Sequence, residues 1–117
     1  MARTLTHGAI YRLPDGTLFD VTETAREAGF RVAVAVTAAL WADIEAIPPS
    51  KRGVQDVAGR LWDVLWMARL AARRGGSETV YRLTLHVGRT SHYQVKMVSG
   101  PGDQGEHVIT LMRPDED

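Results

Sequence analysis

One stretch constrains the fold of this chain more than any other: Gly59 to Arg74, which reads GRLWDVLWMARLAARR. Its residue types and spacing predict a helix over residues 55–74. Gly75 and Gly76 follow at once, where a left-handed C-terminal cap meets no steric penalty. Three arginines in the last turns complement the partial negative charge of a helix end. We therefore treat this helix as the element around which the rest of the chain is organised.

The predicted helix has two apolar sides when it is wound at about 100° per residue. One is a wide arc typical of a core face, and the other is a stripe of Trp62, Trp66 and Leu70, bordered by Arg69 and Arg73. A helix that is apolar on two sides is usually sandwiched between layers, so we expect the stripe to be buried. The alternative is an exposed stripe that meets a partner. The core arc contains Val57, Leu61, Val64, Leu65, Ala68, Ala71 and Ala72.

The rest of the chain predicts an α+β fold. An antiparallel sheet packs against the long central helix, and shorter helices and an N-terminal hairpin complete it. The last three strands have connections too short for parallel crossovers, so we expect an antiparallel meander. The predicted elements are a hairpin of strands 10–13 and 17–21 around Pro14-Asp15-Gly16, helices over 22–28 and 38–47, and strands over 30–36, 79–87, 93–98 and 107–113.

Composition limits the class of protein. The chain has 117 residues, of which 44% are hydrophobic and 24% charged, as expected for one domain over residues 1–117 with a frayed acidic tail at 114–117. There is no cysteine, which excludes disulfides, thiolate metal sites and thiol catalysis and suits a reducing cytosol. We find no secretory signal and no apolar run long enough to span a membrane, so we expect a cytoplasmic protein.

Charge is unevenly distributed, although the formal net charge is zero. Residues 69–98 hold six Lys or Arg against the single acid Glu78, a balance of +5, and residues 103–117 hold five acids against Arg113. The basic segment is either a docking face or is neutralised within the fold. If it docks a protein or a nucleic acid, the candidate partner-binding residues are Trp66, Arg69, Leu70, Arg73, Arg74, Arg82, Arg89 and Lys96.

Chemical sites are weakly indicated. Three histidines, His86, His92 and His107, could bind zinc if the fold gathers them, but their spacing matches no zinc pattern. The loop GPGDQG lacks the Lys-Ser/Thr of a phosphate-binding loop, so we interpret it as a hairpin loop. We therefore predict no cofactor, no metal and no catalytic residue. The carboxylates that could form an acid–base pair or a magnesium site, and that more simply form solvated helix faces, are Asp20, Glu23, Glu27, Asp43 and Glu45.

Three blocks carry a family resemblance: VTETAREAGF at 21–30, GRLWDVLWMARLAARR at 59–74 and GPGDQGEHVITLM at 100–112. Together they resemble an uncharacterised family of small bacterial proteins carried by plasmids and phages. Several members have a proline just after the position of Arg31, where this chain has Val32-Ala33.

The resemblance implies a context and supplies no catalytic residues. In that context we expect a non-enzymatic accessory protein that binds a host or defence-system protein complex, an inhibitor of the anti-CRISPR type being the most concrete version. The alternative is a nucleic-acid-associated regulator encoded by the same mobile element. The sequence does not indicate an oligomeric state.

Overall fold

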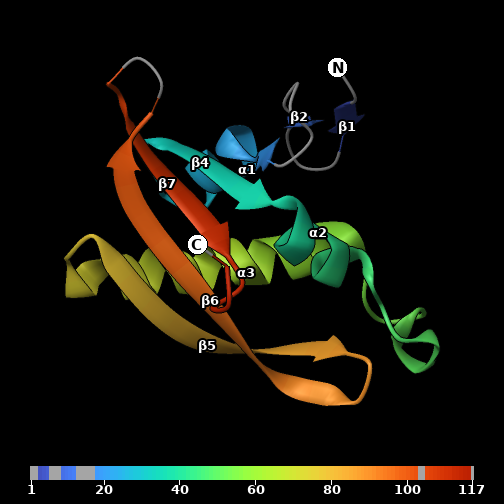
Figure 1. Cartoon of the computed structure of the whole chain (residues 1–117). Helices are drawn as coiled ribbons and strands as arrows, with labels where there is room; N and C mark the ends of the chain where they lie inside the picture. The colour runs from blue at the N-terminus through green and yellow to red at the C-terminus, as the bar shows by residue number, and fades with distance from the viewer. Residues whose placement is uncertain (1–2, 6–8, 13–17, 103–104, 117) are drawn as a thin grey trace.

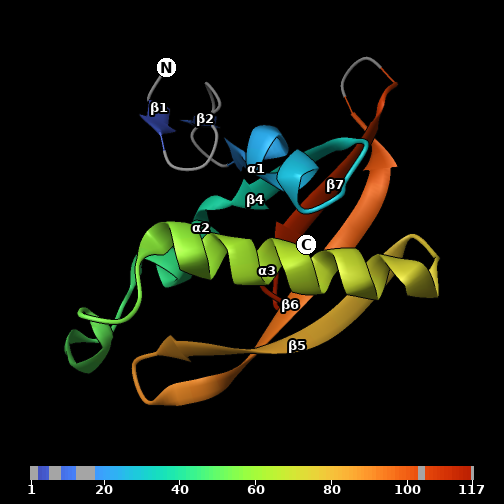
Figure 2. The same cartoon turned by 180° about the vertical axis from the view of Figure 1, so that it is seen from behind.

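The computed structural model describes the backbone of residues 3–5, 9–12, 18–102 and 105–116, and side chains from residue 18 onward. The described strands form one sheet in the order β1-β2-β3-β4-β7-β6-β5. Helices α1, α2 and α3 lie on one face of this sheet, and Figures 1 and 2 show the two opposite views. The strands are β1 (Arg3–Leu5), β2 (Ala9–Arg12), β3 (Leu18–Asp20), β4 (Ala33–Thr37), β5 (Glu78–Val87), β6 (Thr90–Pro101) and β7 (His107–Met112).

The sheet is mixed, which corrects the prediction of a purely antiparallel one. The meander of β5, β6 and β7 is antiparallel as predicted, but β4 pairs with β7 in parallel, with Val34 opposite Ile109. Short connections require antiparallel pairing only between strands that are neighbours in sequence. Since β4 and β7 are separated by most of the chain, their pairing depends on tertiary packing.

The N-terminal hairpin is present as β2 and β3, which pair antiparallel with Arg12 opposite Phe19. The turn predicted at residues 14–16 lies outside the described residues. Helix α1 (Thr22–Glu27) follows, and Gly29 ends this segment with φ +107°. Thr37 is the N-cap of α2 (Ala38–Glu45), because its hydroxyl accepts from the Leu40 backbone N–H at 3.3 Å.

Helix α3 (Val57–Ala71) is shorter than the 55–74 helix predicted from the sequence. Asp56 caps its start by accepting from the Gly59 N–H at 2.7 Å, and its last turn tightens into the 3-10 helix η2 (Ala72–Arg74) before Gly75 at φ +74°. Ahead of α3, a second 3-10 helix, η1, spans Pro49–Lys51.

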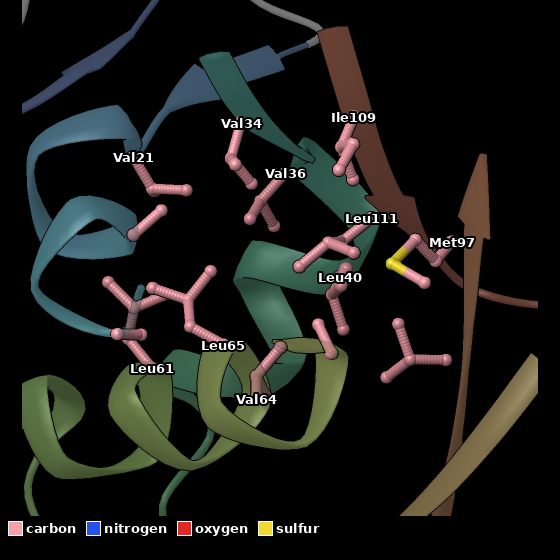
Figure 3. Close-up of a cluster of buried hydrophobic side chains, with 14 of the residues drawn as sticks. Val21, Val34, Val36, Leu40, Leu61, Val64, Leu65, Met97, Ile109 and Leu111 are labelled. Carbon is pink, nitrogen blue, oxygen red and sulfur yellow. The ribbon is translucent and has the colours of Figure 1, made fainter. Parts of the chain in front are cut away.

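The core lies between the helices and the sheet. Figure 3 shows Leu61, Val64 and Leu65 on the inner side of α3, in one buried cluster with Leu40 of α2, Val36 of β4 and Leu111 of β7. All but two residues of the predicted core arc of α3 are buried; Val57 and Ala72 are half-buried against the cluster. The face of the sheet turned away from α3 carries no helix in Figure 1.

The acidic tail, predicted to fray, is bound at Glu116. Its carboxylate accepts from the Thr37 hydroxyl at 2.8 Å and from the Arg113 backbone N–H at 2.7 Å, and its carbonyl accepts from Lys96. Two of these contacts, those to Thr37 and Lys96, reach distant parts of the chain, and so Glu116 is fixed to the sheet.

Candidate partner-binding surface

The stripe predicted to be buried is exposed in large part, so the sandwiched interpretation of α3 is wrong. Trp66 is 46% exposed and Leu70 37% exposed, while Trp62 is half-buried. No described layer covers this side, because the helix packs on the sheet through the core arc alone. We give the name outer face of α3 to Trp62, Trp66, Arg69 and Leu70 of the helix together with Arg73 of η2, which follows it.

Stacking orders the tryptophans of this face. The Trp62 and Trp66 rings are stacked, with centroids 6.1 Å apart and planes 15° from parallel. Arg69 is tied to the rest of the fold because its Nε donates to the Gly29 carbonyl at 3.2 Å. The outer face therefore presents ordered aromatic rings beside a fixed cation, and Arg73 adds an exposed one.

A hollow of about 520 Å³ lies between this side of α3 and the edge of the sheet. Trp66 and Met67 line it from the helix, and Arg82 and Thr84 line it from β5. Asp63, Leu83 and His92 complete the lining. Of all these residues, only Trp66 and Arg82 were predicted from the sequence as partner-binding residues. Asp63 and Met67 fall between the two apolar sides of the helix, so no pattern pointed to them.

A second hollow, of about 720 Å³, adjoins the first, because Asp63 and Thr84 line both. It opens at the start of α3, where Gly59 and Trp62 form part of its wall beside Val54, which is 81% exposed. Both hollows border Asp63, where partial removal of the carboxylate from water raises its pKa.

The base of the second hollow holds Arg60, a charged residue only 3% exposed. Its guanidinium donates to the carbonyls of Ile44 at 2.7 Å and Asp43 at 2.8 Å, and to the Gln55 side-chain oxygen at 3.0 Å. Both carbonyls lie in the last turn of α2, and that of Asp43 also accepts from the Ala46 backbone N–H at 3.2 Å. Burial lowers the pKa of Arg60, and the Asp43 carboxylate opposes that shift. We assign Arg60 a structural role.

The predicted basic residues do not form one face. Arg69 and Arg73 lie on the outer face of α3, whereas Arg74 donates to the Val80 carbonyl at 3.1 Å on the edge of β5. Lys96 stands opposite Val80 in the β5–β6 register, on the side of the sheet turned away from α3. Arg89 lies in the exposed turn between those strands. The basic side chains of residues 69–98, whose formal net charge is +5, thus lie on several separate surfaces.

The histidines are also separate. His86 contacts the Gln55 side chain at 3.3 Å, His92 lines the hollow beside Trp66, and His107 hydrogen-bonds Ser99. Strand β6 lies between β5 and β7, so His86 and His107 are not on neighbouring strands. Within the part of the chain that the structure describes, no group of three or more His, Cys, Asp or Glu could hold a metal ion.

The Ser99–His107 pair has the residue types of a nucleophile and its base, which the sequence analysis did not consider. It is formed across the β6–β7 hairpin and is exposed to solvent. Catalysis by such a pair depends on preorganised donors in a site from which water is excluded. The exposure of this pair is the opposite condition, and we assign it no catalytic role.

Taken together, the fold and this surface define a small α+β protein with a mixed sheet and an apolar, partly cationic helix face open to solvent. The chain belongs to a family of unknown function (DUF6573), whose profile matches residues 8–117. Neither the search of curated proteins nor that of solved structures returned a match. Among the described helices, none has the length and apolar character needed to cross a membrane.

Proposed function

We propose that this chain is a non-enzymatic binding protein, which docks the outer face of α3 on a host macromolecular complex and inhibits or modulates it. The observation that carries the proposal is the exposure of Trp66 and Leu70 beside Arg69 and Arg73. Tryptophan and arginine are enriched in interface hot spots, and exposed apolar patches mark interaction sites. The matching partner surface is apolar at its centre and acidic at its rim.

The kind of partner follows from the resemblance to proteins of plasmids and phages. Accessory proteins of mobile elements often act on host or defence machinery, and an inhibitor of the anti-CRISPR type is the most concrete form of the proposal. Its mechanism is steric and electrostatic, because the helix face occludes a functional surface of the partner.

A nucleic-acid-associated regulator is the second candidate. The observation in its favour is the hollow where Arg82 and His92 lie beside Trp66, since basic side chains next to an exposed aromatic ring suit unpaired bases. Binding of this kind weakens steeply as salt is raised, because neutralised phosphates release counterions. Docking on a protein through Trp66 and Leu70 depends much less on salt.

The test is affinity capture from host lysate with tagged protein, compared with a Trp66→Ala/Arg73→Ala variant. We expect the wild type to recover one host protein complex in a salt-insensitive manner and the variant to lose it. The matched control is Val80→Ala/Arg89→Ala, because Val80 is 43% exposed and neither residue belongs to the outer face of α3. Circular dichroism confirms that both variants are folded.

Two results would contradict the proposal. If both double variants retain the complex equally, the outer face of α3 is not the binding surface. If only nucleic acid is recovered, and salt removes it, the second candidate replaces the first.

A further inference from the structure

The free edge of β5 offers a second kind of contact. β5 is the last strand in the order of the described sheet, so one of its edges lacks a neighbouring strand. The Ser99 backbone N–H donates to the Ser77 carbonyl at 2.8 Å, whereas the Val80 carbonyl accepts from Arg74 on the outer side. In an antiparallel pair, alternate residues direct their backbone groups to the same side. The backbone groups of Arg82 and Thr84 therefore point outward, like those of Val80.

Parts of this edge are protected, as sheet edges usually are. Arg74 covers the Val80 carbonyl at one end, and a register shift between Thr84 and Val87 marks a bulge at the other. Between the Arg74 contact and the bulge, no described strand pairs with the outward N–H and C=O groups of Arg82 and Thr84. Both side chains are exposed. We call the segment from Arg82 to Thr84 the open edge.

The open edge borders the hollow that Trp66 and Met67 line from α3. A strand laid along β5 would direct alternate side chains towards this hollow. Arg74 and Arg82 lie along the same edge, with His92 in the wall of the hollow, while Asp63 is the carboxylate that lines it. The surroundings therefore suit an extended segment that has one apolar side chain and flanking carboxylates.

We propose that the open edge of β5 binds an extended acidic segment of a partner protein by strand addition. The inference rests on the proposed function, because it names the part of a protein partner that the chain recognises. Backbone hydrogen bonds to Arg82 and Thr84 give the segment its direction, and the hollow beside Trp66 receives its apolar side chain. A second copy of this chain fits poorly, since antiparallel pairing centred on Arg82 places two arginines opposite each other.

The experiment uses the full chain and a short synthetic peptide of alternating glutamate and valine. Binding is measured by calorimetry, and amide hydrogen exchange reports on Arg82 and Thr84. We expect the peptide to bind and to slow exchange at these two amides. A peptide of the same sequence, N-methylated at alternate residues, keeps the charge but loses the donors needed for strand addition. We expect it not to bind.

Charge reversal supplies the matched protein variants. Arg82→Glu is expected to weaken peptide binding about tenfold or more, whereas Arg89→Glu, with the same charge change in the turn, changes it less than about threefold. A lysine–valine peptide is expected not to bind. Circular dichroism verifies folding, which should be preserved because both arginines are exposed.

Three results would overturn the inference. Equal binding of the N-methylated peptide means that charge alone is recognised. Absence of binding by the acidic peptide removes the proposed occupant. A free protein that is dimeric, with Arg82 and Thr84 amides already protected, makes a second copy the occupant. None of these results depends on a host partner, so capture through the outer face of α3 can succeed or fail independently.

Discussion

At the scale of single residues, Arg60 shows how a charged side chain becomes part of the core. Local spacing places it on the border of the core arc of α3, and it carries a charge that usually stays in water. Burial is possible here because three N–H groups of the guanidinium donate to two carbonyls at the end of α2 and to the Gln55 side-chain oxygen. These bonds replace the hydrogen bonds that Arg60 would make with water. The planar fork of arginine can satisfy all three acceptors together, which lysine cannot.

We expect Arg60→Ala to lower the free energy of unfolding by about 2–4 kcal/mol, because the Ile44 carbonyl and the Gln55 side-chain oxygen lose the donors that Arg60 supplies and a cavity opens. Urea denaturation followed by circular dichroism measures the change. Arg52→Ala is the control, since that arginine is exposed, and its effect should stay below about 0.5 kcal/mol. Similar losses in the two variants would refute the structural role of Arg60.

At the scale of elements, two tyrosines join the helices to the sheet. The Tyr81 hydroxyl on β5 donates to the Val64 carbonyl of α3 at 2.9 Å, and the Tyr93 hydroxyl on β6 donates to the Asp43 carboxylate of α2. Burial raises the pKa of both phenols far above the usual value of 10.0, and the hydrogen bond to Asp43 raises that of Tyr93 further. Each bond requires the neutral phenol.

These shifts predict a loss of stability in alkali. A phenol whose pKa is higher in the folded state than in the unfolded state holds its proton more tightly when folded. Its contribution to stability is complete below pH 10 and decreases as the pH rises above 10. We expect the free energy of unfolding to fall by up to about 1.4 kcal/mol per pH unit for each tyrosine.

Urea denaturation at a series of pH values from neutral to strongly alkaline tests this expectation. The variant Tyr81→Phe/Tyr93→Phe should be less stable near neutral pH, because two hydrogen bonds are lost, but its stability should fall less steeply above pH 10. An unchanged alkaline slope in the double variant would show that other groups cause the decline.

At the scale of the whole molecule, the C-terminal segment joins the two parts of the sheet. Strand β7 lies between β4 and β6, so it connects the N-terminal strands to the β5–β6 hairpin. Glu116 then contacts Thr37 at the end of β4 and Lys96 on β6. Figure 1 shows the described segment after β7 lying beside β6. The last residues thus stabilise contacts between segments far apart in sequence.

We expect Glu116→Ala to lower the free energy of unfolding by about 1–3 kcal/mol, because its carboxylate accepts two hydrogen bonds that nothing replaces. Asp115→Ala is the matched control: its side chain is 72% exposed and its ion pair with Arg113 spans 3.6 Å. An exposed pair of this kind contributes less than about 1 kcal/mol. Thermal unfolding compares the two, and equal effects would argue against the role of Glu116.

In the candidate surface, some features are set by local sequence and others by tertiary packing. Helical spacing was enough to place Trp62, Trp66 and Leu70 on one stripe, because that relation depends only on the 3.6-residue period. Whether a second layer covers the stripe depends on where the other elements pack, and burial was predicted wrongly. The open edge of β5 could not be found from the sequence, since an edge is defined only by which strands have neighbours.

The sequence by itself determined what short-range interactions control: the helix around residues 57–71, the Thr37 cap, the glycine stops, and the N-terminal and C-terminal hairpins. Each depends on residues close together in the chain. Only the tertiary structure decided the parallel pairing of β4 with β7, the burial of Arg60, the binding of Glu116 and the division of the basic segment. These features join residues far apart in sequence, and local patterns cannot specify which distant groups will meet.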